Sequence, residues 1–248
     1  METGSEVDFL VMGAGVAGLR AAVELARHGD VLVVTKESLG ESNTHYAQGG
    51  IAVAMEGDRD VALHLGDTVN AGDGIVYRPA AEALVAEGPV RVAELMEWGA
   101  RFDRLDGKLL RAREGAHSLA RILHAQGDAT GAEISRALVA CARSHNRIRF
   151  AEWTRVTGLS IVDNRVVAVD LAGATGAHDE SGPAAAECIA TRAVLMASGG
   201  AGQVYSDTTN PEVATGDGIA LAAAAGAELA DMEFYQFHPT ALSISGAP

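Results

Sequence analysis

The sequence is poor in aromatic residues, cysteine and positive charge, and the last two shortages each exclude a class of protein or site. Only 4% of its 248 residues are aromatic, and its two cysteines, Cys141 and Cys188, form no CxxC pair. We therefore expect reduced, buried thiols, with neither a disulfide framework nor a metal site. The 19 lysines and arginines face 33 acids, giving a net charge of −14. Because basic surface supplies most nucleic-acid affinity, we expect no nucleic-acid partner.

Long hydrophobic runs are also absent. The first apolar stretch, residues 9–19, follows acidic residues, whereas a secretory signal begins with positive charge. The longest later run, residues 219–227, is far shorter than the ~18–20 residues that span a bilayer. The sequence thus predicts a soluble, cytoplasmic protein without a membrane partner.

Glycine, by contrast, is abundant, and one glycine-rich motif stands near the start. The 29 glycines make up roughly 12% of the chain, against about 7% in ordinary proteins. A GxGxxG motif is formed by Gly13, Ala14, Gly15, Val16, Ala17 and Gly18. It lies between a strand-like run at 7–12 and a helical pattern at 17–27, with a second strand-like run at 31–35. This βαβ context predicts a parallel sheet and a dinucleotide site, since the glycines permit a tight turn and close approach of a pyrophosphate.

Further helices and strands are indicated along the rest of the chain. Helices are expected at 80–87 and 90–98, split at Gly88-Pro89, at 130–145, opened by a capping box of Thr130 and Glu133, and at 216–225. Strands are expected at 148–150, 156–162, 166–171 and 192–197, the last of them buried. Asp163-Asn164 predicts a hairpin between the second and third strands. Residues 36–78 and 173–186 show little periodicity, which indicates a functional loop region and an exposed loop.

The residue after the second strand departs from the usual dinucleotide pattern. An acid that binds ribose is expected there, about 20 residues after the motif, but the sequence has Thr35-Lys36. Lys36 can contact the ribose or phosphate of an adenosine, or it can be a solvated lysine at a strand end. Spacing alone does not separate these two interpretations.

A polar segment that ends in paired glycines follows soon afterwards. Its residues are Asn43, Thr44, His45, Tyr46, Ala47, Gln48, Gly49 and Gly50. Glycines at this point would bring backbone N–H groups against a flat cofactor ring without side-chain bulk. The segment is therefore a second candidate for contact with a cofactor.

Further motifs follow in order over nearly the whole chain. They are Arg113-Glu-Gly-Ala-His-Ser118, Arg121-Ile-Leu-His124, Asp128-Ala-Thr-Gly131, Ala197-Ser-Gly-Gly200, Thr209-Asn-Pro211, Thr215-Gly-Asp-Gly218 and Gln236-Phe-His-Pro-Thr240. With GxGxxG and Ala47-Gln-Gly-Gly50, this set resembles the flavoprotein family of succinate dehydrogenase, fumarate reductase and L-aspartate oxidase. Within that family the sequence looks most like the L-aspartate oxidases.

The resemblance implies an α/β fold: a Rossmann-like FAD-binding domain with a parallel sheet and an inserted antiparallel β segment. Residues 1–240 would form this domain, incomplete, and residues 241–248 would begin a capping domain. FAD would be held by the GxGxxG motif, the segment from Asn43 to Gly50, and Lys36, Val156, Gly199 and Asp217. Asp217 also stands at the first turn of a predicted helix, which it can simply cap.

The position of Asn43 bears on how FAD would be attached. In membrane-complex members of the family, a histidine just before the Gln-Gly-Gly loop carries FAD covalently, and Asn43 stands at the matching position. The resemblance therefore implies noncovalent FAD. His45 does not align with that histidine and is expected to be a loop residue near the cofactor.

Glu114 and His238 are the catalytic-site residues that the resemblance implies. Glu114 would recognise an amine, since a carboxylate pairs with ammonium and the dicarboxylate dehydrogenases carry no acid there. His238 would bind a substrate carboxylate. Judged alone, Glu114 is an acid in a solvated loop and His238 a core or turn histidine. His117 and His124 are expected to be structural or supporting donors.

Local charge gives independent support for an anionic ligand. Residues 101–124 hold six basic side chains and three acids, although the whole chain is strongly acidic. Such a patch would attract a dicarboxylate, or it can be an ordinary solvated surface.

The implied reaction is FAD-dependent oxidation of L-aspartate to iminoaspartate, with hydride transfer to flavin N5 and with oxygen or fumarate as acceptor. By resemblance it is the first step of NAD biosynthesis, and quinolinate synthase would take the product. One alternative is a soluble fumarate reductase or succinate dehydrogenase flavoprotein. Another is an FAD-binding module without turnover, because the family's capping domain, with its proposed acid/base arginine, begins about where the sequence stops.

Overall fold

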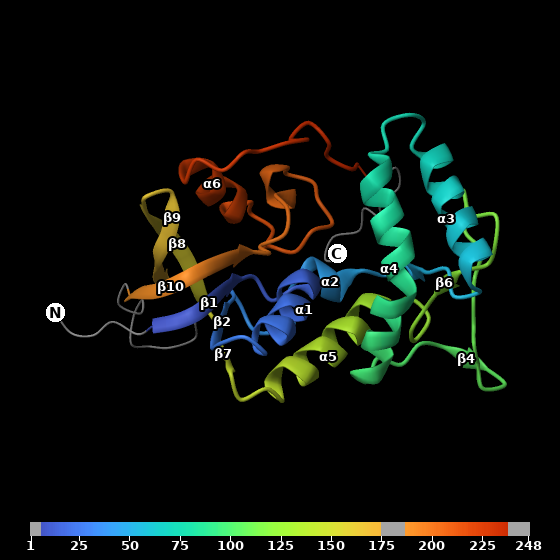
Figure 1. The fold of residues 1–248 in the computed structure, drawn as a ribbon, viewed down its shortest axis with the longest axis horizontal. Helices are drawn as coiled ribbons and strands as arrows, with labels where there is room; N and C mark the ends of the chain where they lie inside the picture. The colour runs from blue at the N-terminus through green and yellow to red at the C-terminus, as the bar shows by residue number, and fades with distance from the viewer. Residues whose placement is uncertain (1–5, 175–186, 238–248) are drawn as a thin grey trace. The chain divides into compact units, whose positions relative to one another are not determined.

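A six-stranded sheet dominates the computed structural model, which describes residues 6–174 and 187–237 (Figure 1). The strand order is β7-β2-β1-β10-β9-β8. The parallel strands are β7 (Ile148–Ala151), β2 (Val31–Val34), β1 (Glu6–Met12) and β10 (Glu187–Met196). The antiparallel strands are β9 (Arg165–Gly173) and β8 (Thr154–Val162). This mixed sheet confirms the predicted Rossmann-like α/β fold with an inserted antiparallel segment.

Contacts among the described residues divide the chain into two compact units. The sheet unit comprises Met1–Asn43 and Ala142–Pro248, and the helical unit comprises Thr44–Cys141. Besides its strands, the sheet unit holds helices α1 (Val16–Leu25) and α6 (Asp217–Ala224) and the 3-10 turn η1 (Gly202–Val204).

The core of the sheet unit follows from the alternation of side chains along its strands. Leu10 and Met12 of β1 belong to a buried cluster with Val156 and Val169 of the antiparallel strands. Val11, on the opposite face of β1, approaches Gly18 of α1. Full burial of each such side chain contributes about 1.5–3 kcal/mol. Helix α1 and the antiparallel strands therefore pack against β1 through alternating residues.

The turn between β8 and β9 is the predicted hairpin. Asp163 and Asn164 both have positive φ, 49° and 60°, as a two-residue type I′ turn requires. Asn and Asp tolerate this conformation because their short polar side chains stabilise it locally. The hairpin prediction is confirmed.

Strand β10 differs from the prediction in extent and burial. It begins at Glu187 rather than at residue 192, and its side chains alternate between core and solvent. Ile189 is buried, whereas Cys188 is exposed and Leu195 is 38% exposed. The expectations of a fully buried strand and of a buried Cys188 are wrong. Cys141 is partly buried, and neither cysteine forms a disulfide within the described residues.

The helical unit is built from longer helices joined by short strands. The helices are α2 (Asn43–Tyr46), which begins at the last residue of the sheet unit's first segment, α3 (Asp58–Ala71), α4 (Arg78–Glu97) and α5 (Thr130–Arg143). Strand β3 (Ile51–Ala52) lies between α2 and α3 in the sequence, and β4 (Arg104–Leu105), β5 (Lys108–Leu109) and β6 (Ile122–Leu123) lie between α4 and α5. Helices α3 and α4 pack side by side (Figure 1). Strands β3 and β6 pair antiparallel, as do β4 and β5. No helix among the described residues is long and apolar enough to cross a membrane.

Helix α3 corrects the prediction that residues 36–78 form a loop region. Its inner face carries Asp60, His64 and Asp67, which are one helical turn apart and therefore share a face. A helix whose inward side chains are polar gives no apolar periodicity. That is why the pattern did not predict it.

Helix α4 runs without a break through Pro89, so the predicted split at Gly88-Pro89 is wrong. Proline in a helix interior removes one backbone hydrogen bond and costs about 3 kcal/mol relative to alanine. Buried Ala81 and Val85 precede it, and buried Val92 and Leu95 follow it on the same helix. Burial on both sides of Pro89 offsets the cost of keeping one helix.

The start of α5 was placed correctly at Thr130, but the predicted capping box does not form. The Thr130 hydroxyl accepts from the Ala125 N–H at 3.1 Å. The Glu133 carboxylate instead accepts from Arg136 and from the Arg101 N–H. Hydrogen bonds from Arg136 lower the pKa of Glu133 despite the opposing effect of burial. Glu133 thus ties α5 to the loop at Arg101.

Candidate functional site

The GxGxxG motif forms the turn between β1 and α1. Gly13 has φ of 109°, and an added Cβ there would collide with the carbonyl oxygen of Ala197. A Cβ on Gly18 would collide with the carbonyl oxygen of Gly13. Side chains are therefore excluded where the turn meets the end of β10 and where α1 packs on it.

The amino end of α1 is suited to a phosphate. Its N-cap is Gly15, no side chain caps the helix there, and its first turn contains no acid. The positive end of a helix dipole and N–H groups of the first turn attract anions in such a setting. Ala14, Val16 and Ala17 complete the same turn.

Lys36 joins the carboxyl end of β2 to the start of α6. Its Nζ lies 3.0 Å from Asp217 Oδ2 and 2.5 Å from Thr215 Oγ1. Burial alone would raise the pKa of Asp217, but hydrogen bonds from Thr215 and Lys36, with the charges of Lys36 and Arg155, lower it. The N-cap of α6 is Gly216, so Asp217 does not cap the helix. Lys36 is thus ion-paired and partly buried, and its contact with an adenosine stays a prediction.

The remaining predicted residues of the sheet unit lie near the same ends of the parallel strands. Gly199 follows β10, has φ of 74°, and has no described atom within 4 Å of an added Cβ. Val156 is buried near the start of β8, and Thr154 donates to the carbonyl oxygen of Thr35 at 2.9 Å. Dinucleotides bind at the carboxyl ends of strands in open parallel sheets. The sheet unit thus brings Gly13–Gly18, Lys36, Val156, Gly199 and Asp217 to that end of its sheet.

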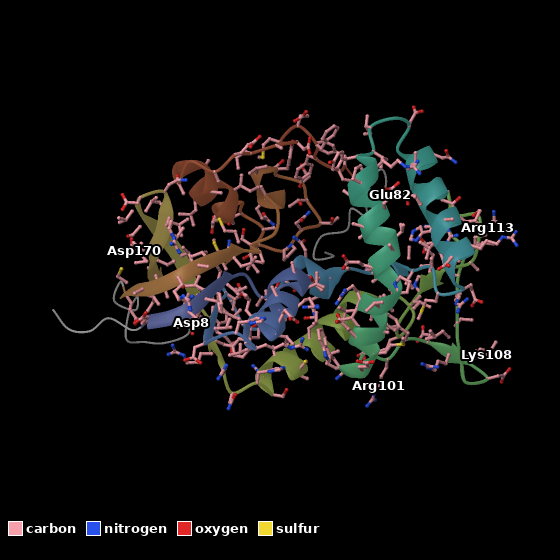
Figure 2. All side chains as sticks on the ribbon, viewed as in Figure 1. Asp8, Glu82, Arg101, Lys108, Arg113 and Asp170 are labelled. Carbon is pink, nitrogen blue, oxygen red and sulfur yellow. The ribbon has the colours of Figure 1, made fainter. Side chains whose placement is uncertain are left out.

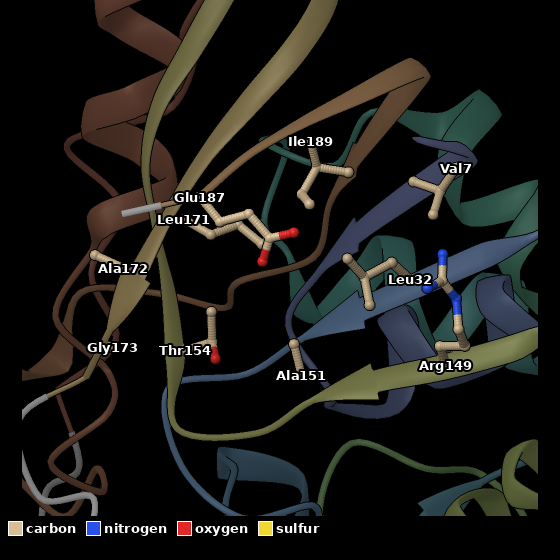
Figure 3. A pocket seen from close by; sticks show the side chains of 10 residues that line it. All are labelled: Val7, Leu32, Arg149, Ala151, Thr154, Leu171, Ala172, Gly173, Glu187 and Ile189. Atoms are coloured by element: carbon tan, nitrogen blue, oxygen red, sulfur yellow. The ribbon is translucent and has the colours of Figure 1, made fainter. Parts of the chain in front are cut away.

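A separate pocket in the sheet unit holds none of the predicted residues (Figure 3). Its volume is about 190 Å³, and apolar Val7, Leu32 and Ile189 line it together with Arg149 and Glu187. Val7 and Leu32 belong to the amino-terminal halves of their strands. This pocket is therefore not the predicted dinucleotide site.

In the helical unit, the segment from Thr44 to Gly50 lies against α5 and β6. Gly131 donates its N–H to Ala47 O at 2.9 Å, and a Cβ on Gly131 would collide with Thr44 O. A Cβ on Gly50 would press on Ile122 and on the Leu123 carbonyl. Gly49, in contrast, faces open space. The paired glycines thus have different roles, one in packing and one that leaves backbone accessible.

Glu114 meets His124 beside this segment. His124 Nε2 lies 3.6 Å from Glu114 Oε1, with side-chain exposures of 26% and 55%. An added Cβ on Gly50 would lie 2.9 Å from His124 Cε1. The structure therefore brings the predicted amine-recognition residue close to the glycine pair. His238, the predicted carboxylate-binding residue, lies outside the described residues.

A buried charge cluster fixes the loop that carries Glu114, and sequence reasoning did not identify it as a unit. Arg121 is fully buried and pairs with Asp60 Oδ1 at 3.0 Å and with Asp67 Oδ2 at 2.5 Å. Asp67 also accepts from Ser118 N–H and Oγ at 2.8 and 2.9 Å. His117 Nδ1 lies 3.1 Å from Arg121 Nη1. These contacts attach the loop to α3.

Charge and burial perturb the acid–base groups of this cluster. Burial would raise the pKa of Asp67, but hydrogen bonds from Ser118 and Arg121 lower it to about 2. Burial and the neighbouring Arg121 lower the pKa of His64, whose Nδ1 is buried without a hydrogen-bond partner among the described residues. Asp67 is therefore a charged anchor and His64 favours its neutral form.

The predicted cationic patch is weaker than the count of its residues indicated. Arg121 is neutralised by Asp60 and Asp67, and Arg111 pairs with Glu56; all three acids lie outside residues 101–124. Figure 2 shows Arg113 and Lys108 at the periphery of this unit. Among the described residues, no group of three His, Cys, Asp or Glu could hold a metal ion.

The chemistry of these residues fits FAD. The glycine turn and uncapped α1 suit a pyrophosphate, Lys36 and Asp217 suit the hydroxyls of a ribose, and Gly49 and Gly199 have room for a cofactor where a Cβ would otherwise stand. The first set lies in the sheet unit and Gly49 in the helical unit.

Comparison with known proteins agrees with this chemistry. A family model described as "FAD binding domain" matches residues 8–247. The curated L-aspartate oxidase of Streptomyces coelicolor is 48% identical over 95% of this chain and 40% of its own length. That of Mycobacterium leprae is 43% identical over 96% of this chain and 44% of its own length. The chain thus spans about two fifths of the curated relatives that it matches.

Solved structures share the fold. The Mycobacterium smegmatis Sdh1 complex in its apo form matches with 34% identity and a TM-score of 0.79, over 89% of this chain and 39% of the other. A quinol-fumarate reductase with menaquinol matches with 28% identity and a TM-score of 0.78, over 88% and 37%. Since the family model covers nearly the whole sequence, the chain belongs to the family of FAD binding domains.

Proposed function

We propose that the chain is part of an L-aspartate oxidase that oxidises L-aspartate to iminoaspartate with noncovalent FAD. The observation that carries this proposal is the placement of Glu114 beside the Gly49-Gly50 turn, in a family whose curated relatives of 42–48% identity are L-aspartate oxidases. An ammonium group gives a carboxylate something to bind, whereas succinate offers it nothing.

Each residue set has a defined role in this proposal. When bound, FAD would supply the acceptor, flavin N5, for the hydride of the substrate Cα. The turn from Gly13 to Gly18 holds its pyrophosphate, Lys36 and Asp217 its ribose, and the Val156 backbone its adenine. Gly199 and the segment from Asn43 to Gly50, with Thr44, His45, Tyr46, Ala47, Gln48 and Gly49, line the rest of the cofactor.

Two side chains bind the substrate in this proposal. Glu114 binds the ammonium group of aspartate, and His238 binds a carboxylate. Asn43 has no imidazole for a histidyl bond to FAD, so the cofactor is noncovalent. We further propose a cytoplasmic reaction at the start of NAD biosynthesis, with oxygen or fumarate as acceptor and quinolinate synthase as the consumer of iminoaspartate.

The domain organisation belongs to the same proposal. Residues 1–240 form an incomplete FAD-binding domain, and residues 241–248 begin a capping domain. Coverage of two fifths of the relatives' length supports the view that this stretch is part of a longer enzyme. On its own, this stretch is expected to bind FAD weakly or not at all and to show no turnover, and normal aspartate oxidation by it would contradict the division.

Anaerobic addition of L-aspartate to the full-length, FAD-loaded enzyme tests the function. We expect the yellow flavin to bleach with aspartate, and Glu114→Gln to lower kcat/KM for aspartate by roughly 10–100-fold, because a hydrogen bond to a charged group contributes about 1.5–3 kcal/mol. Bleaching by succinate but not aspartate would establish the second candidate, a soluble succinate dehydrogenase or fumarate reductase flavoprotein. The likeness to the Sdh1 complex favours that candidate. Bound flavin that neither substrate reduces would indicate a binding module.

A further inference from the structure

The contact between Glu114 and His124 has a consequence for the proton that an amine must lose. At neutral pH an amino acid carries an ammonium group, and a nitrogen without a lone pair cannot assist the departure of a hydride from the adjacent carbon. A proton must therefore leave the nitrogen. Glu114 alone binds the ammonium, but a carboxylate is a weak base for taking up its proton.

The helical unit holds an imidazole in place to receive that proton. His124 follows β6, whose Ile122 and Leu123 are buried and paired with β3. The His124 carbonyl accepts from the Asp103 N–H at 2.8 Å. Its Nε2 faces Glu114 Oε1 at 3.6 Å, and its side chain remains 26% exposed. The imidazole is thus fixed through its backbone, close to the carboxylate, and open to solvent.

Glu114 is held by hydrogen bonds within its own loop. Its carbonyl accepts from the His117 N–H at 3.3 Å, and the Arg113 Nε donates to the His117 carbonyl at 2.9 Å. Ser118, at the end of this loop, is anchored on Asp67. The approach of Glu114 to His124 therefore joins two segments that are each fixed by other contacts.

We propose that His124 is a positioning residue that acts through Glu114 as the acceptor of the amine proton. The N–H bond of the ammonium breaks as a proton passes to the Glu114 carboxylate. The proton then passes to His124 Nε2, which leaves a neutral amine, a regenerated carboxylate and an imidazolium. No electrons move in this step, and the exposed imidazolium releases its proton to water. The relay requires the tautomer of neutral His124 that carries its proton on Nδ1.

The charges around His124 determine how the relay responds to pH. Glu114 faces its Nε2, while the Asp103 carboxylate accepts from the N–H groups of Gln126 and Gly127. Arg113 is directed at the His117 carbonyl, and Arg121 at Asp60, Asp67 and His117. In acid, an imidazolium at His124 would donate to Glu114 and compete with the substrate ammonium. Aspartate oxidation should therefore decline in acid, where this competition sets in.

This inference rests on the proposed function, and its test uses two half-reactions of the full-length, FAD-loaded enzyme. In the first half-reaction aspartate reduces the flavin, and this reduction requires loss of the amine proton. Reoxidation of the reduced flavin by fumarate involves no amine. Both rates are measured by stopped flow from about pH 5 to pH 9, with His124→Gln, Glu114→Gln and the exposed His28→Gln as matched control.

We expect His124→Gln to slow reduction by aspartate roughly 10²-fold, the lower range for a proton-transfer group, and to remove the acid decline. Reoxidation by fumarate and FAD content should stay within about twofold of wild type, as should both rates in His28→Gln. Histidine ¹⁵N spectra of the enzyme without substrate give a reading that does not depend on turnover, and Glu114→Gln should change the protonation pattern of His124 alone.

Several outcomes would overturn the relay. One is an unchanged acid decline in His124→Gln, and another is an equal loss in both half-reactions, which would indicate a structural role. A third is a ¹⁵N spectrum of His124 that is the same in Glu114→Gln and in wild-type enzyme. If wild-type enzyme is not reduced by aspartate at all, the proposed function itself fails, and the inference fails with it.

Discussion

Neutralising Asp67 measures how much the buried charge cluster stabilises the helical unit. The pKa of Asp67 falls from 3.8 to about 2 in the folded chain. Each pKa unit corresponds to about 1.36 kcal/mol, so the charged form contributes about 2 kcal/mol to the free energy of unfolding. The folded pKa lies below the unfolded one, so this contribution is fully present above about pH 4 and is lost as the pH falls through about 2.

Asp67→Asn keeps the shape of the side chain and removes its charge. We expect it to lower the free energy of unfolding by about 2 kcal/mol at neutral pH, and by less as the pH falls below about 4. Urea unfolding of the whole chain gives this difference, and hydrogen exchange of the Ser118 amide locates it. Loss of protection at Ser118 should accompany the loss of stability, because Asp67 accepts its N–H.

Glu82→Gln is the matched control in the same unit. Glu82 pairs with Arg78 at 2.8 Å, with side chains 50% and 62% exposed, and such surface pairs contribute about 0–1 kcal/mol. Equal losses in the two variants would refute the argument. So would a loss in Asp67→Asn that does not shrink as the pH approaches about 3.

Three further predictions test packing and cofactor binding. Gly50→Ala should destabilise the chain by about 1–3 kcal/mol, whereas Gly49→Ala, which meets open space, should not; equal thermal midpoints would contradict the packing at Gly50. Pro89→Ala should raise the free energy of unfolding by up to about 3 kcal/mol, because it restores a helix hydrogen bond. A lower thermal midpoint of this variant would show that Pro89 does not destabilise α4. Lys36→Met should weaken FAD binding by roughly tenfold in a fluorescence titration, while substitution of the exposed Lys108 by Met should not. Equal affinities of the two variants would show that Lys36 does not bind the cofactor.

The parts of the fold that could be predicted are those in which apolar side chains fill the interior. The runs at β1 and β2 gave parallel strands because a strand covered on both faces is apolar along much of its length. Asp163-Asn164 gave the hairpin because few residues accept two positive φ values. The exposure of Cys188 was not predicted, because the face of the sheet on which its side chain lies depends on the register of β10. The composition of the strand alone does not determine that register.

The candidate site was predictable only in its backbone and its motifs. Glycine positions indicated where the backbone turns with positive φ or where another group approaches it closely, since both are suited to a residue without a side chain. The pairing of Lys36 with Asp217, and of Arg121 with Asp60 and Asp67, joins residues far apart in the sequence. Complementary charge alone offers many partners, so only the folded chain selects among them.

The buried ion pairs also explain how two separate segments can hold Glu114 and His124 together. Replacing a buried ion pair with apolar residues is often neutral or favourable for stability, so stability alone does not account for Arg121. Burial of apolar area is non-directional, whereas a guanidinium binding carboxylates fixes distance and orientation. Arg121 leads into β6, which ends just before His124, and Asp67 binds both Arg121 and the loop of Glu114. One aspartate on α3 thus sets the separation of the two residues across which we propose that the proton moves.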